Sequence, residues 1–151
     1  NFKDEVMKKA FTMIELIFVI VILSIIAVVA VPRLAATRDD AEIAKAAMNI
    51  QTLIADIGSY YTAQGKFSAN ISDMSNVLQP IYAKRDKCLD ITTLNSANGT
   101  ISVNLSTSGL CEKVWSLPAL EATKELIAGT AGGTKDVNTI KFGGTGIKYQ
   151  Y

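Results

Sequence analysis

The sequence contains no histidine among its 151 residues. Histidine is the commonest general base of enzymes and the commonest protein ligand of zinc, and catalytic triads are built on it. Its absence excludes a Cys/His nucleophile pair and a mixed Cys/His metal site. No other catalytic, cofactor-binding or metal-binding pattern stands out. We therefore expect that the chain is not an enzyme and holds no cofactor.

The sequence also lacks an excess of charge of one sign. It has 15 Lys and Arg against 14 Asp and Glu, a formal net charge of +1. No basic cluster with interleaved aromatic residues occurs, so nothing indicates a nucleic-acid partner. The acidic pairs Asp39–Asp40 and Asp86 with Asp90 lack the alternating acids and glycine of a calcium loop. We interpret these acids as solvated charge and expect no metal site.

What the sequence does have is a long apolar segment, residues 11–32, FTMIELIFVIVILSIIAVVAVP. About 20 consecutive apolar residues are enough for a helix to cross the hydrocarbon core of a bilayer. Lys8 and Lys9 lie just before the segment, separated from it by Ala10, and such positive charge favours a cytoplasmic N-terminus. We predict one membrane-spanning helix, with the rest of the chain outside the cytoplasm.

Glu15 is the one acidic residue of this segment. A carboxylate inside a membrane helix costs roughly 2.5–3.5 kcal/mol on insertion scales. We therefore expect Glu15 to pair with a positive charge or to serve a function. The alternative is a protonated glutamate that is tolerated near the membrane edge.

The residues around Glu15 have a characteristic order, KKA followed by FTMIEL over residues 8–16. This order resembles the cleavage and methylation signal of type IV pilins and of the pseudopilins of type II secretion. The resemblance implies that a prepilin peptidase cuts between Ala10 and Phe11 and that the new amine of Phe11 is methylated. It also implies that Glu15 pairs with the Phe11 amine of a neighbouring subunit during assembly. One departure is Ala10, where the family usually has glycine.

The resemblance further implies a structural subunit that polymerises through its N-terminal helix into a pilus or pseudopilus. The implied partners are copies of the chain in a helical filament, minor pilins, the prepilin peptidase, the membrane, and an inner-membrane assembly platform with its ATPase. The precursor would lie in the bacterial inner membrane as a single-pass protein. The assembled filament would be periplasmic or on the cell surface.

The apolar pattern continues beyond Pro32 as one face of a helix. The spacings are four and three residues, which is the period of an amphipathic helix. Gly65 ends the pattern, and glycine is a common helix terminator because it accepts a positive φ. The residues of this stripe are Ile43, Ala47, Ile50, Ile54, Ile57 and Tyr61.

A small antiparallel sheet would cover this stripe. Asn98-Gly99 predicts a two-residue hairpin turn that places Leu94 opposite Val103. Further strands are expected around Ile140 with Phe142, and around Ile147, Tyr149 and Tyr151. A short helix is predicted over 118–127, with Ser116 as its cap.

The expected fold is therefore α+β and pilin-like, a long N-terminal helix packed on a small antiparallel sheet. We divide the chain into a leader (1–10), a transmembrane and polymerisation helix (11–32), the amphipathic half of that helix (33–65) and a globular head (66–151).

Cys88 and Cys111 are the only cysteines. An even cysteine count in an oxidising compartment favours one disulfide. Closing a loop of this size would stabilise the fold by roughly 3 kcal/mol in the chain-entropy model. The alternative is a pair of free, buried thiols.

Two other interpretations of the chain remain open. The apolar segment could be an ordinary secretory signal cut before Val31, with Val28 and Ala30 at the preceding recognition positions. The chain could also be a membrane-anchored or secreted extracytoplasmic binding domain that does not polymerise. The residue at which the mature protein begins distinguishes these cases.

Overall fold

The computed structural model describes residues 12–128 and 138–143 of the chain. The chain forms two compact units, Asn1–Arg38 and Asp39–Tyr151. One long helix, α1 (Met13–Gln64), contributes residues to both units. The predicted strand around Ile147, Tyr149 and Tyr151 lies outside the described residues.

Helix α1 follows the predicted periodicity in its second half. Its buried residues recur at helical spacing and include most of the predicted stripe, whereas Ile54 and Tyr61 are half-buried. The helix ends where glycine was expected to end it, because Gly65 has a φ of +68° and its N–H donates to the Tyr61 carbonyl at 2.7 Å. The fully or nearly fully buried residues are Ile43, Ala46, Ala47, Ile50, Leu53 and Ile57.

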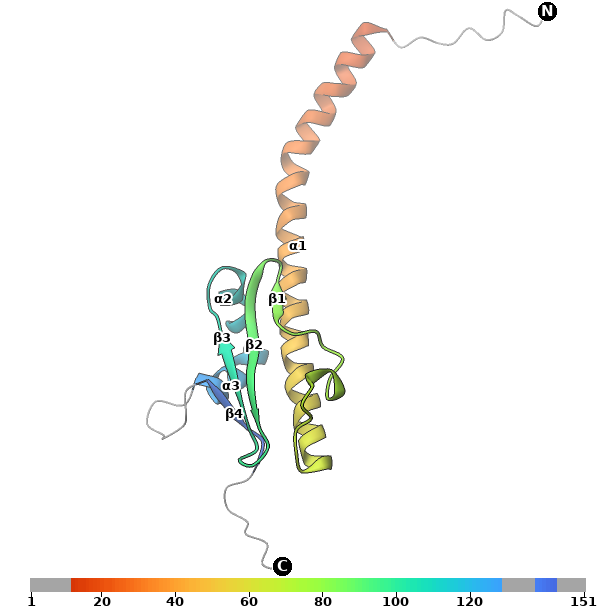
Figure 1. Cartoon of the computed structure of the whole chain (residues 1–151). Coiled ribbons are helices and arrows are strands. Elements are labelled where there is room, and N and C mark those ends of the chain that lie inside the picture. The colour runs from red at the N-terminus through yellow and green to blue at the C-terminus, as the bar shows by residue number, and fades with distance from the viewer. Residues whose placement is uncertain (1–11, 129–137, 144–151) are drawn as a thin grey trace, which may run out of the picture. The chain divides into compact units, whose positions relative to one another are not determined.

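The sheet of the second unit has four antiparallel strands in the order β1-β2-β3-β4 (Figure 1). Their bounds are Ile81–Ala83, Asp86–Asn95, Thr100–Leu105 and Thr139–Lys141. Ile101 and Val103 of β3 are buried, as their alternation predicts. A long helix with a small antiparallel sheet is the α+β fold expected from the sequence.

The predicted register of the β2–β3 hairpin was wrong. Leu94 pairs with Ile101 and Asn95 with Thr100, which leaves four residues in the loop instead of two. The type I′ turn typical of Asn-Gly needs positive φ at both central residues, and of Asn98 and Gly99 only the glycine has it. The Asn95 side chain instead accepts the Asn98 N–H at 3.2 Å and stabilises the longer loop.

The 3-10 turn η1 (Ile71–Asp73) precedes the hairpin. The short helix α2 (Leu110–Trp115), which follows the hairpin, was not predicted. The predicted helix is present as α3 (Pro118–Ala128). Ser116 does not cap it. Its hydroxyl donates to the Lys113 carbonyl at 2.8 Å, and its backbone N–H bonds the Glu112 carbonyl, so Ser116 ends α2.

Residues of α1, the sheet, α2 and α3 share one core. Trp115 is its largest member and is 2% exposed. The Gln51 amide adds a polar contact at its edge, donating to the Ala119 carbonyl of α3 at 2.9 Å. The second half of α1 is thus held by side-chain burial on one face.

Gly65 offers a test of how α1 is terminated. A Cβ at this position would meet no atom within 4 Å, so any cost of replacement comes from the backbone. We expect Gly65→Ala to lower the free energy of unfolding by about 1–2 kcal/mol, the cost of a left-handed conformation. Gly65→Asn should lose less, because asparagine tolerates that conformation. Thermal unfolding followed by circular dichroism would measure both variants, and equal losses would contradict the explanation.

Candidate functional site

The N-terminal end of α1 holds Glu15 in a reciprocal hydrogen-bond arrangement with Thr12. The backbone N–H and the hydroxyl of Thr12 each donate to Glu15 Oε2 at 2.9 Å, and the Glu15 N–H donates to the Thr12 hydroxyl at 3.3 Å. The Thr12 carbonyl accepts the Leu16 N–H. These are the contacts of a capping box, which satisfies the unpaired donors of the first helical turn.

Both Thr12 bonds reach the same carboxylate oxygen of Glu15. Within residues 12–128 and 138–143, no donor reaches Oε1. Among these described residues, one oxygen of the carboxylate is therefore engaged by its own chain and the other has no donor. An ammonium group approaching Oε1 could bind without breaking the capping box.

Thr12 is the functional residue that the sequence reasoning missed. The signal was present, because Thr12 and Glu15 form the T-x-x-E pattern that precedes an apolar run in a capping box. Phe11 and Ala10, the residues of the predicted cleavage site, lie outside the described residues. Their relation to Glu15 stays a prediction.

The first half of α1 is apolar on every side. In the described part of the chain, α1 is the one helix long and apolar enough to cross a membrane, and an 18-residue stretch of it has a mean hydropathy of 3.2. Among the described residues this stretch is exposed, and Phe18 and Ile25 are each about two-thirds exposed. Ser24 is satisfied within the helix, since its hydroxyl donates to the Ile20 carbonyl at 2.6 Å. This surface is compatible with anchoring in a membrane.

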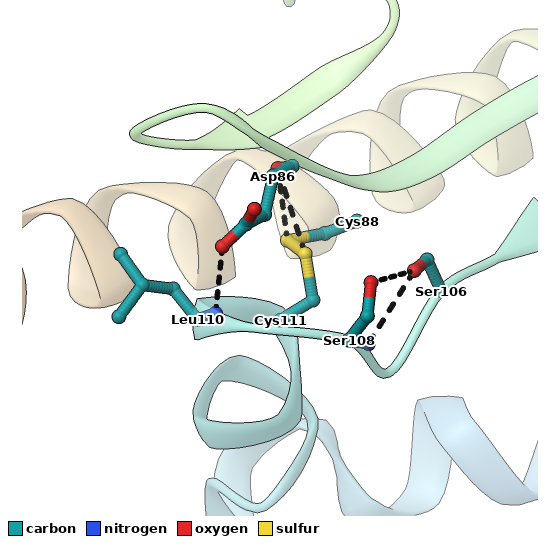
Figure 2. Close-up of a disulfide and its surroundings, with 6 residues drawn as sticks. All are labelled: Asp86, Cys88, Ser106, Ser108, Leu110 and Cys111. Atoms are coloured by element: carbon teal, nitrogen blue, oxygen red, sulfur yellow. Dashed lines mark hydrogen bonds between the residues drawn. A yellow bond between two sulfur atoms is a disulfide. The ribbon is translucent and has the colours of Figure 1, made fainter.

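The two cysteines lie in the second unit. Cys88 of β2 and Cys111 of α2 form a disulfide, and both are fully buried. Figure 2 shows Asp86 above this bond, and its carboxylate accepts the Leu110 N–H at 2.8 Å where α2 begins. On the other side, the hydroxyls of Ser106 and Ser108 lie 3.0 Å apart and order the segment that leads into α2. The disulfide and Asp86 together join α2 to β2.

The acidic pairs do not gather into a metal site. Among the described residues, no group of three or more acidic or cysteine side chains could hold a metal ion. Asp39 accepts from Lys84 at 2.8 Å and Asp90 from Lys87 at 3.0 Å, both as partly exposed ion pairs. Such pairs contribute little to stability.

One comparison with known proteins bears on the N-terminal segment. Residues 7–31 match the family model described as the prokaryotic N-terminal methylation motif. No curated protein and no solved structure matches the chain. The matched residues include the basic pair, Ala10, Phe11 and Glu15, on which the resemblance to prepilins rests. The N-terminal segment of this chain is therefore that of a prepilin- or pseudopilin-type protein.

Proposed function

We propose that the chain is a structural subunit of a type IV pilus or a pseudopilus, anchored in a membrane before assembly and polymerising through α1. The observation that carries this proposal is the apolar surface of α1 over residues 13–31, which is exposed among the described residues and contains a single carboxylate. A contiguous exposed apolar surface such as that of residues 13–31 indicates a lipid or protein partner.

The same surface can serve two environments in turn. In the bilayer, lipid covers the apolar side chains of residues 13–31. In a polymer, the corresponding helices of other subunits would cover them. Contacts that join copies head to tail without closing a ring produce an open helical filament, so two different, complementary faces of this helix would be enough to build a fibre.

Glu15 would set the position of each new subunit. Cleavage between Ala10 and Phe11 would create an ammonium group, and Oε1 of Glu15, which no donor from the described residues reaches, is suited to receive such a group from a neighbouring copy. Opposite charges attract strongly where the dielectric constant is low, and a buried charge without its partner is costly. The pairing would therefore favour association in a single register.

The proposed organisation assigns residues 1–10 to a leader, 11–32 to the anchor and polymerisation helix, 33–65 to the amphipathic half of that helix and 66–151 to the head. The N-terminus of the precursor would be cytoplasmic, and the head would be periplasmic or on the cell surface. The prepilin peptidase, minor pilins and an ATPase-driven platform in the inner membrane would be the partners in processing and assembly.

The mature N-terminus tests the proposal directly. In cells that contain a prepilin peptidase, we expect intact-mass and N-terminal sequencing to find a chain that begins at Phe11 and carries a methyl group. Ala10→Gly, which gives the residue usual in the family, should be processed at least as completely. A chain that begins at Val31 would instead indicate a secreted domain, and one that keeps Met7 an uncleaved anchor. Either result would contradict the proposal.

A further inference from the structure

Two arginines, Arg33 and Arg38, follow the apolar segment of α1. Both side chains are exposed. The ion pairs among the described residues join Lys84 to Asp39 and Lys87 to Asp90, so neither arginine takes part in one. Both guanidinium groups are therefore open to an anionic partner from outside these residues.

The length of the apolar segment sets the depth of the two arginines, given the membrane anchoring proposed above. Residues 13–31 form about 28 Å of helix, which matches a hydrocarbon core of about 30 Å. The headgroup layer adds roughly 5–8 Å on each side of this core. Along the helix, the backbone of Arg33 lies about 3 Å beyond the segment and that of Arg38 about 10 Å beyond it.

The direction of helical side chains brings the charge of Arg38 back toward the bilayer. In an α-helix the Cα–Cβ bonds tilt toward the N-terminus, and long side chains extend the same way. For α1 this is the direction of the membrane segment. Arg38 can thus place its guanidinium in the headgroup layer, and Arg33, whose backbone already lies there, keeps its charge in the layer by snorkelling.

Phosphate is the anionic group that the headgroup layer offers at this depth, and it suits a guanidinium. Arginine binds phosphate through two parallel N–H donors, which gives a stronger and more directional contact than lysine makes. The next charges along the chain are acids, Asp39, Asp40 and Glu42. A surface of phosphates attracts the arginines and repels these acids, so the order of apolar residues, arginines and acids favours one depth.

We propose that Arg33 and Arg38 bind the phosphates of lipid headgroups on the non-cytoplasmic side of the membrane and favour anionic phospholipids there. The contacts hold the anchor at a fixed depth while the subunit is in the bilayer, and they break when it leaves. This inference rests on the proposed membrane anchoring of α1 and is independent of cleavage and of filament assembly.

Solid-state NMR of the full chain in vesicles of phosphatidylcholine and phosphatidylglycerol tests the contact. With ¹³C at Cζ of every arginine, dephasing by lipid ³¹P reports the approach of a guanidinium to a phosphate. We expect strong dephasing in the unmodified chain and its loss in the double variant Arg33→Lys with Arg38→Lys, in which Arg85 is the remaining arginine. Dephasing that persists in the double variant, or that is absent from the unmodified chain, would overturn the proposal.

Competition between lipids measures the preference for anionic headgroups. Electron paramagnetic resonance of spin-labelled phosphatidylglycerol gives its association with the protein relative to phosphatidylcholine. One cation near an anionic membrane surface contributes about a fivefold preference. Arg33→Gln and Arg38→Gln should each lower the relative association by about this factor, whereas Lys8 and Lys9 are present in every variant and add a constant background.

Lys45→Gln is the matched control for the loss of one positive charge. Lys45 is an exposed cation of the same helix. It lies about 21 Å beyond the apolar segment along α1, which is more than two Debye lengths at physiological salt. The variant should leave the preference for phosphatidylglycerol unchanged. A loss equal to that of Arg33→Gln would reveal a general charge effect and overturn the proposed site.

Alkaline extraction separates this inference from the proposed anchor. All variants should stay in the membrane pellet, because the apolar segment is unchanged in each of them. Release of the unmodified chain would contradict the anchor, and this inference would fail with it. A chain that stays in the membrane without arginine–phosphate contacts would overturn this inference alone.

Discussion

Replacement of Glu15 by alanine is expected to leave membrane insertion intact and to abolish detectable filaments. The change removes a charged residue from an apolar helix, which lowers the cost of insertion. It also leaves the ammonium group of a neighbouring Phe11 without its proposed partner. Breaking a buried ion pair on one side costs about 3–5 kcal/mol, equivalent to more than about a hundredfold weaker addition of each subunit. Fractionation and immunoblotting of membranes and of sheared surface material would measure both effects.

Ser24 provides the matched control for Glu15. It is a polar residue of the same apolar segment, but its hydroxyl is satisfied by the Ile20 carbonyl of its own helix. Ser24→Ala should insert and assemble like the unmodified chain. Normal filaments from Glu15→Ala would count against the proposed pairing. Monomers alone from the unmodified chain would support the alternative of an anchored domain that does not polymerise.

Removal of the disulfide by the double substitution Cys88→Ala and Cys111→Ala is expected to lower the free energy of unfolding of the head by roughly 3 kcal/mol. For a unit of this size, that corresponds to a fall of roughly 10–20 °C in Tm. The bond joins β2 to α2, and helix α2 has only six residues with which to hold its place. Circular dichroism of the detergent-solubilised chain during heating would record the change.

Chemical reduction controls for side effects of the two alanines. Reductant should lower the Tm of the unmodified chain toward that of the double variant and leave the double variant unchanged. Alkylation of the denatured, unreduced protein should label neither Cys88 nor Cys111. Two labelled thiols, or an unchanged Tm in the double variant, would contradict a stabilising disulfide.

The parts of the fold that sequence reasoning predicted are those with long periodic patterns. The stripe from Ile43 to Ile57 repeats over several turns, and Gly65 marks the end of the helix, so α1 could be predicted almost to the residue. The β2–β3 hairpin was predicted from Asn98-Gly99 and from the alternation after it. Its register was not, because the Asn95 side chain stabilises a loop two residues longer.

The elements that the sequence did not predict are those that form only through contacts with other elements. Strand β1 has three residues, too few for a pattern, and exists through its pairing with β2. Helix α2 is also too short to show a period, and its ends depend on Asp86 and Ser116, which bond its first and last turns. Ser116 was consequently assigned to the wrong helix.

The candidate site was predictable in its chemistry but not in its local geometry. Glu15 was conspicuous because charge is rare in an apolar run. Its partner Thr12 was not predicted, although the T-x-x-E pattern of Thr12 and Glu15 indicates a capping box. In the proposed assembly, the contacts of Phe11 would depend on another molecule and on cleavage, which a single chain does not contain.

The capping box also bears on how reversible the proposed fibre would be. A single subunit already satisfies one carboxylate oxygen of Glu15 through Thr12, so its charge is partly stabilised before assembly. Because an ammonium group could bind Oε1 without breaking the capping box, a subunit leaving the proposed polymer would keep these internal bonds. The free energy gained at each joint would then be measured from a carboxylate that is already partly satisfied, which would make the joint weaker than one formed by a bare anion and easier to undo.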